Sequence, residues 1–244
     1  MNTLAEAPGA AKHTAESVAE AVLRFVAELR PDDAPAPQEL LRRRAVREGS
    51  PLAIESSVWR AKGWRWIRFT RISGDGATDI VNFGMFPEPA SPFPVLQLES
   101  LVLRGRLFLA IHDVNDLADG GSGLEPSPRR ALSNNPLFPR CEDRAPWTDA
   151  VFSKEVFWTR PQDPGALAAL PARTEDFLEA ARTWRRGGRR QEFDPERRRA
   201  RIGALAAAMI ENEPSRNYLA AQFGPEWSER FIRGFLFPDF LHTA

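Results

Sequence analysis

Hydrophobic residues recur at helical spacing near the start of the chain. Between Thr14 and Leu29 the apolar positions lie three or four residues apart, which predicts an amphipathic helix with Thr14 as its N-cap. The proline-rich stretch 31–37 ends this helix, and a second short helix is expected over 38–47. Residues 1–13 are rich in alanine and lack such a pattern, so we expect a flexible N-terminal tail there.

The middle of the chain has the residue types and the alternation of β-strands. Short turns join successive runs, including Ser73 to Gly76 and Gly105, which favours an antiparallel meander. A segment rich in glycine, proline and asparagine, 119–139, is expected to be a long loop. Strands are predicted at 54–60, 64–72, 78–86, 94–104, 106–114 and 156–159.

Helical spacing returns after Pro164. Helices before and after a run of strands indicate an α+β fold in which helices cover both faces of a central antiparallel sheet. No internal repeat or second boundary is visible, and residues 14–244 are expected to form a single domain. The predicted C-terminal helices span 165–187, 194–212, 214–223 and 225–235.

The composition argues against several classes of protein. The chain has 33 basic and 33 acidic residues and a formal net charge of zero, which does not favour nucleic-acid binding. Without an apolar run of membrane-spanning length or a secretory signal pattern, we expect a cytoplasmic protein with no membrane partner. A single cysteine, Cys141, and three widely separated histidines argue against a disulfide framework or a metal site of familiar spacing.

Positive charge is nevertheless concentrated in one segment. Residues 182–201 contain nine arginines against three acidic residues. Such a run is typical of a solvated helical face, but it also suits a surface that docks an acidic partner. The residues alone leave both interpretations open.

Polar residues interrupt two of the predicted strands. Both faces of strand 94–104 are largely apolar, which places Glu99 in or near the interior. There a carboxyl group tends to keep its proton and can act as a proton donor, although a rim position paired with an arginine is an equally good interpretation. Asn82 presents the same pattern in strand 78–86, where its amide needs partners or a ligand. Asp113 is expected to cap a turn.

The motifs of common enzyme classes are absent from the sequence, including the nucleophile elbow, the glycine-rich phosphate loop and the dinucleotide fingerprint. A succession of segments over 54–240 instead resembles the ferredoxin-dependent bilin reductases and, more distantly, the red chlorophyll catabolite reductases. These segments are MFPEP from Met85, a proline at 94 with an acidic residue five positions later, LFLAIHDVNDL from Leu107, PRCEDRAPWTDAVFSKEVFWTRP from Pro139 and NEPSRNYLAAQFGPEWSERFIRGFLF from Asn212.

The resemblance implies both a fold and a chemistry. The fold would be a three-layer α/β/α sandwich with a central antiparallel sheet. The chemistry would be reduction of a linear tetrapyrrole such as biliverdin by single electrons from ferredoxin, through bilin radicals and with no cofactor bound to the enzyme. The protein would supply protons and a pocket, and we expect it to act as a monomer.

The resemblance also implies roles for individual residues. Glu99 stands where the family usually has its central catalytic Asp, and Glu213 stands where it has a second acid. Asn82 stands where members that form phycocyanobilin have a His, and the chain resembles members of the phycoerythrobilin pathway in having Asn there. We therefore expect a reaction product of the 15,16-dihydrobiliverdin type. The further expected substrate contacts are Asn212, Ser153 and the candidate propionate clamps Arg140, Arg144, Lys154 and Arg216.

Two alternatives remain. The chain resembles red chlorophyll catabolite reductases in having Glu at position 99, which favours a chlorophyll-derived linear tetrapyrrole as substrate. A non-catalytic bilin carrier with the same fold is the other alternative. The presence of both Glu99 and Glu213 argues against a carrier, because binding alone does not require two acids. Binding of biliverdin without turnover would favour the carrier.

Overall fold

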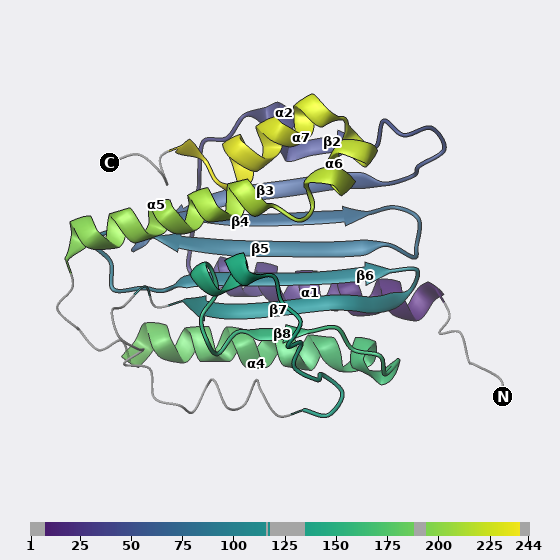
Figure 1. The fold of residues 1–244 in the computed structure, drawn as a ribbon, viewed down its shortest axis with the longest axis horizontal. Coiled ribbons are helices and arrows are strands. Elements are labelled where there is room, and N and C mark those ends of the chain that lie inside the picture. The colour runs from purple at the N-terminus through teal and green to yellow at the C-terminus, as the bar shows by residue number, and fades with distance from the viewer. Residues whose placement is uncertain (1–7, 116, 118–134, 188–193, 240–244) are drawn as a thin grey trace.

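The computed structural model describes residues 8–115, 117, 135–187 and 194–239, and it has helices, then a sheet, then helices along the chain (Figure 1). The strands are β1 Asp32–Asp33, β2 Arg42–Arg44, β3 Ala53–Ala61, β4 Trp64–Ser73, β5 Asp79–Pro87, β6 Val95–Leu103, β7 Arg106–Asn115 and β8 Phe157–Thr159. The helices are α1 Pro8–Glu28, α2 Gln38–Leu41, the 3-10 helix η1 Pro146–Ala150, α4 Gly165–Gly187, α5 Pro195–Asn212, α6 Arg216–Phe223, α7 Pro225–Phe231 and the π-helix η2 Ile232–Leu236.

The eight strands form one antiparallel sheet. Its order is β1-β3-β4-β5-β6-β7-β8, and the short β2 pairs with β3 beyond the end of β1. Tight turns let β3 to β7 follow one another as a meander. The turn after β4 needs a glycine, because Gly74 has φ 149° and a Cβ atom there would lie 2.2 Å from the carbonyl oxygen of Pro51.

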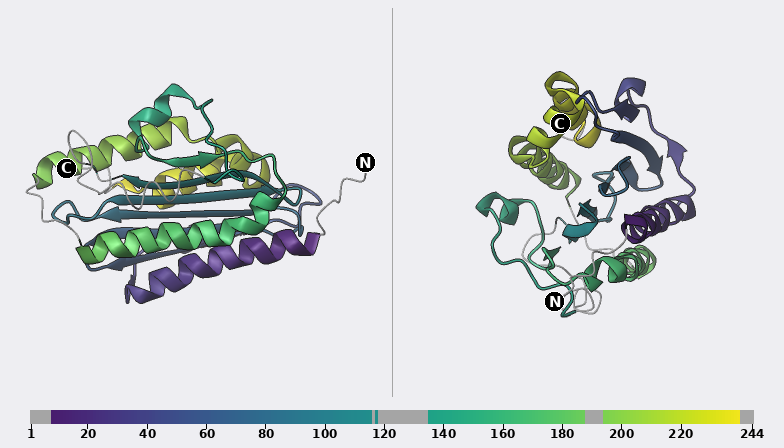
Figure 2. Two further views of the ribbon diagram at one scale, coloured as in Figure 1. Left: turned by 90° about the horizontal axis from the view of Figure 1, so that it is seen from below. Right: turned by 90° about the vertical axis from the view of Figure 1, so that its right-hand side faces the viewer.

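Helices cover both faces of the sheet, so the predicted three-layer α/β/α sandwich is confirmed (Figure 2). Helices α1 and α4 pack on one face, where Phe25 and Phe177 meet Phe83 and Leu98 of the strands. On the other face lie η1, α5, α6 and α7 (Figure 2). The apolar residues of this second layer surround the central part of the sheet that carries the polar residues discussed below.

The structure differs from the predicted element boundaries at the N-terminal end. Helix α1 begins at Pro8, six residues before Thr14, and so includes part of the segment expected to be a tail. The helix predicted over 38–47 ends at Leu41, because Arg42–Arg44 continue as a strand paired with β3. Most of the loop predicted at 119–139 lies outside the described residues.

The last predicted helix, 225–235, changes type along its length: it is α-helical to Phe231 and a π-helix from Ile232 to Leu236. None of the helices in the described part of the chain is both long enough and apolar enough to cross a membrane.

Candidate active site

A row of polar residues crosses the centre of the sheet on the face toward α5, α6 and α7. The strand register pairs Thr70 of β4 with Asn82 of β5, and Asn82 with Glu99 of β6. Directly paired residues of antiparallel strands project from the same face, and their side chains are neighbours. The structure therefore brings together Asn82 and Glu99, which the sequence had singled out on separate strands.

Glu99 has the properties of a proton donor near neutral pH. Burial raises its pKa from 4.5 to about 7, and the carboxylate of Glu213 adds to this rise. The positive charge of Arg68 and the amide of Asn82 act in the opposite direction. A carboxyl group whose pKa lies close to the working pH holds a proton and can also release it.

Glu213 approaches the same place from the helical layer. It follows the last turn of α5 and accepts hydrogen bonds from the backbone N–H of Ser215 (3.0 Å) and from the Ser215 hydroxyl (2.6 Å). Its charge acts on both Glu99 and Arg68, so the second carboxylate lies near the polar row. One acid thus comes from the sheet and the other from the helices above it.

Arg68 is the residue of this site that the sequence reasoning missed. Only 2% of it is exposed, and its guanidinium donates a hydrogen bond to Oδ1 of Asn82. The rings of Phe237 and Phe86 lie 5.3 and 5.9 Å from its Cζ atom. The alternation Trp66, Arg68, Thr70, Ile72 is the signal that would have found it, since it places a charge on an otherwise apolar strand face.

Two of the predicted substrate contacts belong to the packing of the helical layer. Arg216 donates to the carbonyl oxygen of Ile210 and forms an ion pair with Glu229 of α7. Asn212 donates from Nδ2 to the carbonyl oxygen of Ala208, one turn earlier in α5 (2.9 Å). Because these contacts tie both side chains to the helical layer, they give no support to a role in clamping a propionate.

The remaining predicted contacts lie together in the segment around η1 and β8. Ser153 donates its hydroxyl hydrogen to Asp113 of β7 (2.5 Å), and its backbone N–H also points to that carboxylate. Asp113 therefore holds this segment against the sheet. Arg140 donates to the carbonyl oxygen of the exposed Lys154 (3.1 Å), and Arg144 pairs with Asp149 (3.4 Å).

His112 is not part of the site. It lies on the opposite face of the sheet, stacked between Phe157 and Phe177 with ring centroids 5.0 Å apart on either side. It is only 1% exposed, and burial together with the charge of Arg173 lowers its pKa to about 3. It is a neutral core residue.

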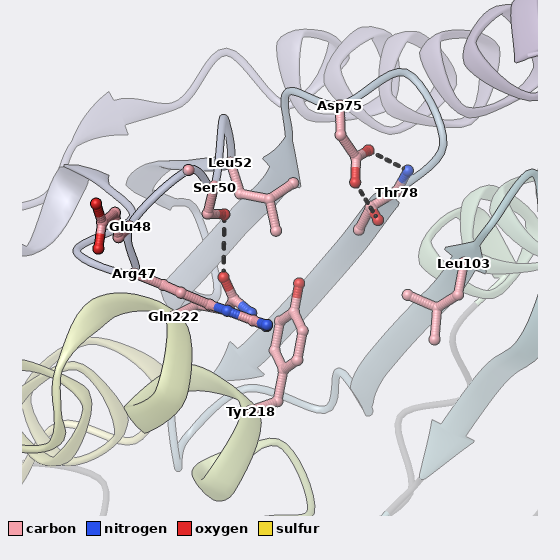
Figure 3. Close-up of a pocket in the computed structure, with 10 residues that line it drawn as sticks. Arg47, Glu48, Ser50, Leu52, Asp75, Thr78, Leu103, Tyr218 and Gln222 are labelled. Carbon is pink, nitrogen blue, oxygen red and sulfur yellow. Dashed lines mark hydrogen bonds between the residues drawn. The ribbon is translucent and has the colours of Figure 1, made fainter.

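Two open pockets lie at the ends of the strands, away from the polar row. The first has a volume of about 310 Å³ and is bordered by Tyr218, Gln222 and the turn at Asp75, with the Tyr218 hydroxyl directed across it (Figure 3). The second, of about 500 Å³, lies at the other end beside Trp64 and Phe93. Neither of these two pockets includes any of the predicted site residues.

The fold is an α/β/α sandwich, and a polar cluster that includes Glu99, with its raised pKa, lies between the sheet and one helical layer. Comparison with known sequences gives the family of the chain: the profile of the ferredoxin-dependent bilin reductases matches residues 18–238. The chain belongs to the ferredoxin-dependent bilin reductase family, as the resemblance predicted.

The individual relatives are named for several different activities. The chain is 25% identical over 218 residues to the phycoerythrobilin:ferredoxin oxidoreductase of Gloeobacter violaceus, which covers 83% of this chain and 86% of the relative. It is also 25% identical over 197 residues to the 15,16-dihydrobiliverdin:ferredoxin oxidoreductase of Parasynechococcus marenigrum, covering 76% and 82% of the two chains.

The fold is shared with a solved structure, phytochromobilin synthase from tomato in complex with biliverdin. The TM-score is 0.74 at 17% sequence identity, and the superposition covers 91% of this chain and 82% of the tomato chain. At this level of identity the likeness concerns the fold.

In the described part of the chain, no group of three or more His, Cys, Asp or Glu residues is arranged to hold a metal ion.

Proposed function

We propose that this protein reduces a linear tetrapyrrole, biliverdin IXα or a close derivative, with electrons from reduced ferredoxin. Membership of the bilin reductase family supports this reaction class. The observation that carries the proposal for this chain is the convergence of Glu99 and Glu213 on one side of the sheet, with the pKa of Glu99 raised to about 7. A bilin between the sheet and α5 would lie between the side chains of these two acidic residues.

The reaction needs two electrons and two protons for each carbon–carbon double bond that becomes single. Each electron comes from one reduced ferredoxin, which is oxidised. In our proposal Glu99 donates one proton to the bilin radical and Glu213 donates the other, each recovering its proton from solvent. The protein therefore contributes position and protons, and we propose that it binds no cofactor of its own.

For the position of reduction, we propose the bridge of biliverdin that gives a 15,16-dihydrobiliverdin product. Asn82 supports this proposal, because an amide cannot take up and release a proton as a histidine does. Overall identity does not separate the possible products, since relatives named for phycoerythrobilin, 15,16-dihydrobiliverdin and phycocyanobilin are all 23–25% identical to the chain.

The test is anaerobic incubation of the purified protein with biliverdin, with and without a reduced ferredoxin system, followed by absorbance and product chromatography. We expect a bound-bilin spectrum that converts to a dihydrobiliverdin only when ferredoxin is reduced. A bound spectrum that never converts would instead identify a bilin carrier. Conversion of a chlorophyll-derived linear tetrapyrrole, but not of biliverdin, would move the substrate to that class.

The same preparation tests the other expectations. We propose a cytoplasmic, monomeric, single-domain enzyme that is colourless before bilin is added. Light scattering after size exclusion would check the monomer, and the absorbance of the purified protein would check for flavin and iron. A bound flavin spectrum would contradict the proposal that the protein carries no cofactor.

A further inference from the structure

Arg68 is a buried charge without a carboxylate partner. No Asp or Glu among the described residues forms a salt bridge with it, and its one hydrogen bond goes to the neutral amide of Asn82. Its Nε atom is out of reach of solvent and has no hydrogen-bond partner in the described part of the chain. Burial lowers its pKa only to about 10, so the guanidinium stays charged at neutral pH.

The fold makes room for this guanidinium. Gly84, the register partner of Arg68, has no side chain, and a Cβ atom there would lie 3.0 to 3.1 Å from Cζ, Nε and Nη2 of Arg68. The group therefore lies over Gly84, within the polar part of the sheet face. Gln97, the next residue in the same register row, is also buried and has an Nε2 atom without a described partner.

An unpaired buried charge is costly, and removal of its hydration is normally offset by an opposite charge. Here the charges of Glu99 and Glu213 act on Arg68, but neither residue forms a salt bridge with it in the described part of the chain. Two donor sites, Arg68 Nε and Gln97 Nε2, are thus unused beside a proton donor. Such an arrangement suits a group that becomes negative only during the reaction.

We propose that Arg68 stabilises the negative charge that the bilin acquires when it accepts an electron from ferredoxin. This inference rests on the proposed function and assigns its electrostatic centre. The electron converts the bilin to a radical anion, whose charge spreads onto the oxygen and nitrogen atoms facing Arg68. Protonation by Glu99 then gives the neutral radical and leaves a Glu99 carboxylate, which the same guanidinium stabilises. Arg68 keeps its own proton throughout.

Arg68 also fixes the direction of Asn82. Because Oδ1 of Asn82 accepts from the guanidinium, its NH₂ group is directed away from Arg68 and is free to act on the paired Glu99. The arginine is thus a positioning residue for Asn82 as well as a fixed charge beside the substrate.

The test is spectroelectrochemistry of bound biliverdin in the wild type and in Arg68→Met, which removes the charge but keeps an unbranched side chain of similar length. We expect oxidised biliverdin to bind with similar affinity and the first reduction to shift to a more negative potential. The shift should correspond to about 100-fold weaker relative binding of the one-electron-reduced bilin, the size of losing one fixed donor to a developing anion.

Three further variants keep the test decisive. Arg68→Lys retains the charge and should recover most of the potential. Gly84→Ala, which crowds the guanidinium without removing it, should shift the potential in the direction of Arg68→Met but by less. The matched control is Arg173→Met, which removes another buried arginine from the opposite face and should leave the potential unchanged.

An unchanged potential in folded Arg68→Met would overturn the proposal, as would an equal shift in Arg173→Met. If Arg68→Met does not fold, the comparison of Arg68→Lys with Gly84→Ala decides, since a merely structural arginine would leave the potential of both at the wild-type value. Because an electrode supplies the electrons, failure of ferredoxin to reduce the wild-type complex would count against the proposed function and not against this assignment.

Discussion

At the scale of single residues, the chemistry of Glu99 comes from its neighbours. Burial and Glu213 favour its protonated form, whereas Arg68 and Asn82 favour the carboxylate, and the balance leaves its pKa at about 7. A longer side chain than the Asp usual in the family also carries the acid further from the strand. Small changes among these four residues are therefore expected to alter proton delivery without altering the fold.

Replacing Glu99 by Gln removes the transferable proton and keeps the shape. We expect Glu99→Gln to bind biliverdin at close to wild-type affinity, to accept an electron and to accumulate a bilin radical. Turnover should fall by about 100- to 10,000-fold, the usual contribution of a general acid. Anaerobic absorbance and electron paramagnetic resonance would measure both effects.

Two further variants are compared with Glu99→Gln. Glu99→Asp should keep part of the activity, and Glu213→Gln should stall at a different stage or change the product. Full turnover in Glu99→Gln would mean that water or another residue delivers the proton, and the central assignment would be wrong.

The raised pKa of Glu99 also predicts the pH dependence. Between pH 4.5 and about 7 the folded protein holds this proton and the unfolded chain does not. The contribution of Glu99 to stability is therefore fully present below pH 4.5 and is lost as pH rises through about 7. Where transfer of the Glu99 proton limits turnover, the turnover rate should also fall as pH rises above about 7. Single-turnover rates of the wild type across pH 6 to 9 would check this, and a rate that rises with pH would contradict it.

The residues of the site differ in how far the sequence could predict them. Glu99 and Asn82 were visible because each is polar on a strand with apolar neighbours, and the register of a meander makes them adjacent. Arg68 was missed because an arginine is normally exposed, and only Gly84 on the next strand makes its burial possible. The contacts of Ser153 and Arg216 are tertiary, and no local pattern encodes them.

At the scale of elements, strong periodicity was sufficient for most of the fold. The five central strands and helices α4 and α5 begin and end within a few residues of their predicted bounds, whereas α1 begins six residues early. The missed strands β1 and β2 have no apolar alternation. Each is a short polar segment that becomes a strand only because the edge of β3 is available for pairing. Periodicity cannot reveal such a partner.

The contact between β7 and α4 leads to a second pH prediction. His112 must stay neutral between Phe157 and Phe177, and its pKa falls from 6.5 to about 3. Below pH 6.5 the unfolded chain binds a proton that the folded protein excludes, so stability should be lost as pH falls from 6.5 toward 3. His112→Phe keeps the aromatic stack and should abolish this loss.

Because Glu99 has the opposite slope over part of this range, the comparison is best made in a Glu99→Gln background. Chemical denaturation at pH 7.5 and at pH 5 would give the free energies of unfolding. If the histidine and phenylalanine proteins lose the same stability between the two pH values, His112 does not carry the effect.

At the scale of the whole molecule, a net charge of zero hides an uneven distribution. Part of the arginine-rich segment 182–201 serves packing: Arg182 pairs with Glu28 of α1, and Arg198 and Arg201 donate to the backbone carbonyls of Phe93 and Leu117. Replacing these three arginines would therefore test the stability of the fold and not the docking of a partner. Arg189 and Arg190 of the same segment lie outside the described residues.

We propose that this segment receives the acidic ferredoxin, and charge reversal of Arg189 and Arg190 tests it. Fixed charges at the rim of an interface mainly govern association, so ferredoxin-driven turnover should slow at low ionic strength while biliverdin affinity stays nearly unchanged. The difference from the wild type should shrink as salt screens the interaction. Stopped-flow reduction and bilin titration would measure the two quantities separately.

The matched control is charge reversal of Arg42 and Arg44, which are exposed on the short strand β2 and change the net charge by the same amount. If both double variants slow turnover equally, the effect is one of overall charge and not of a docking surface. An equal loss of turnover and bilin affinity in the Arg189 and Arg190 variant would show that the segment supports the bilin site or the fold. Docking predicts that turnover slows only in the Arg189 and Arg190 variant. A higher ferredoxin concentration should restore this turnover, whereas a higher bilin concentration should not.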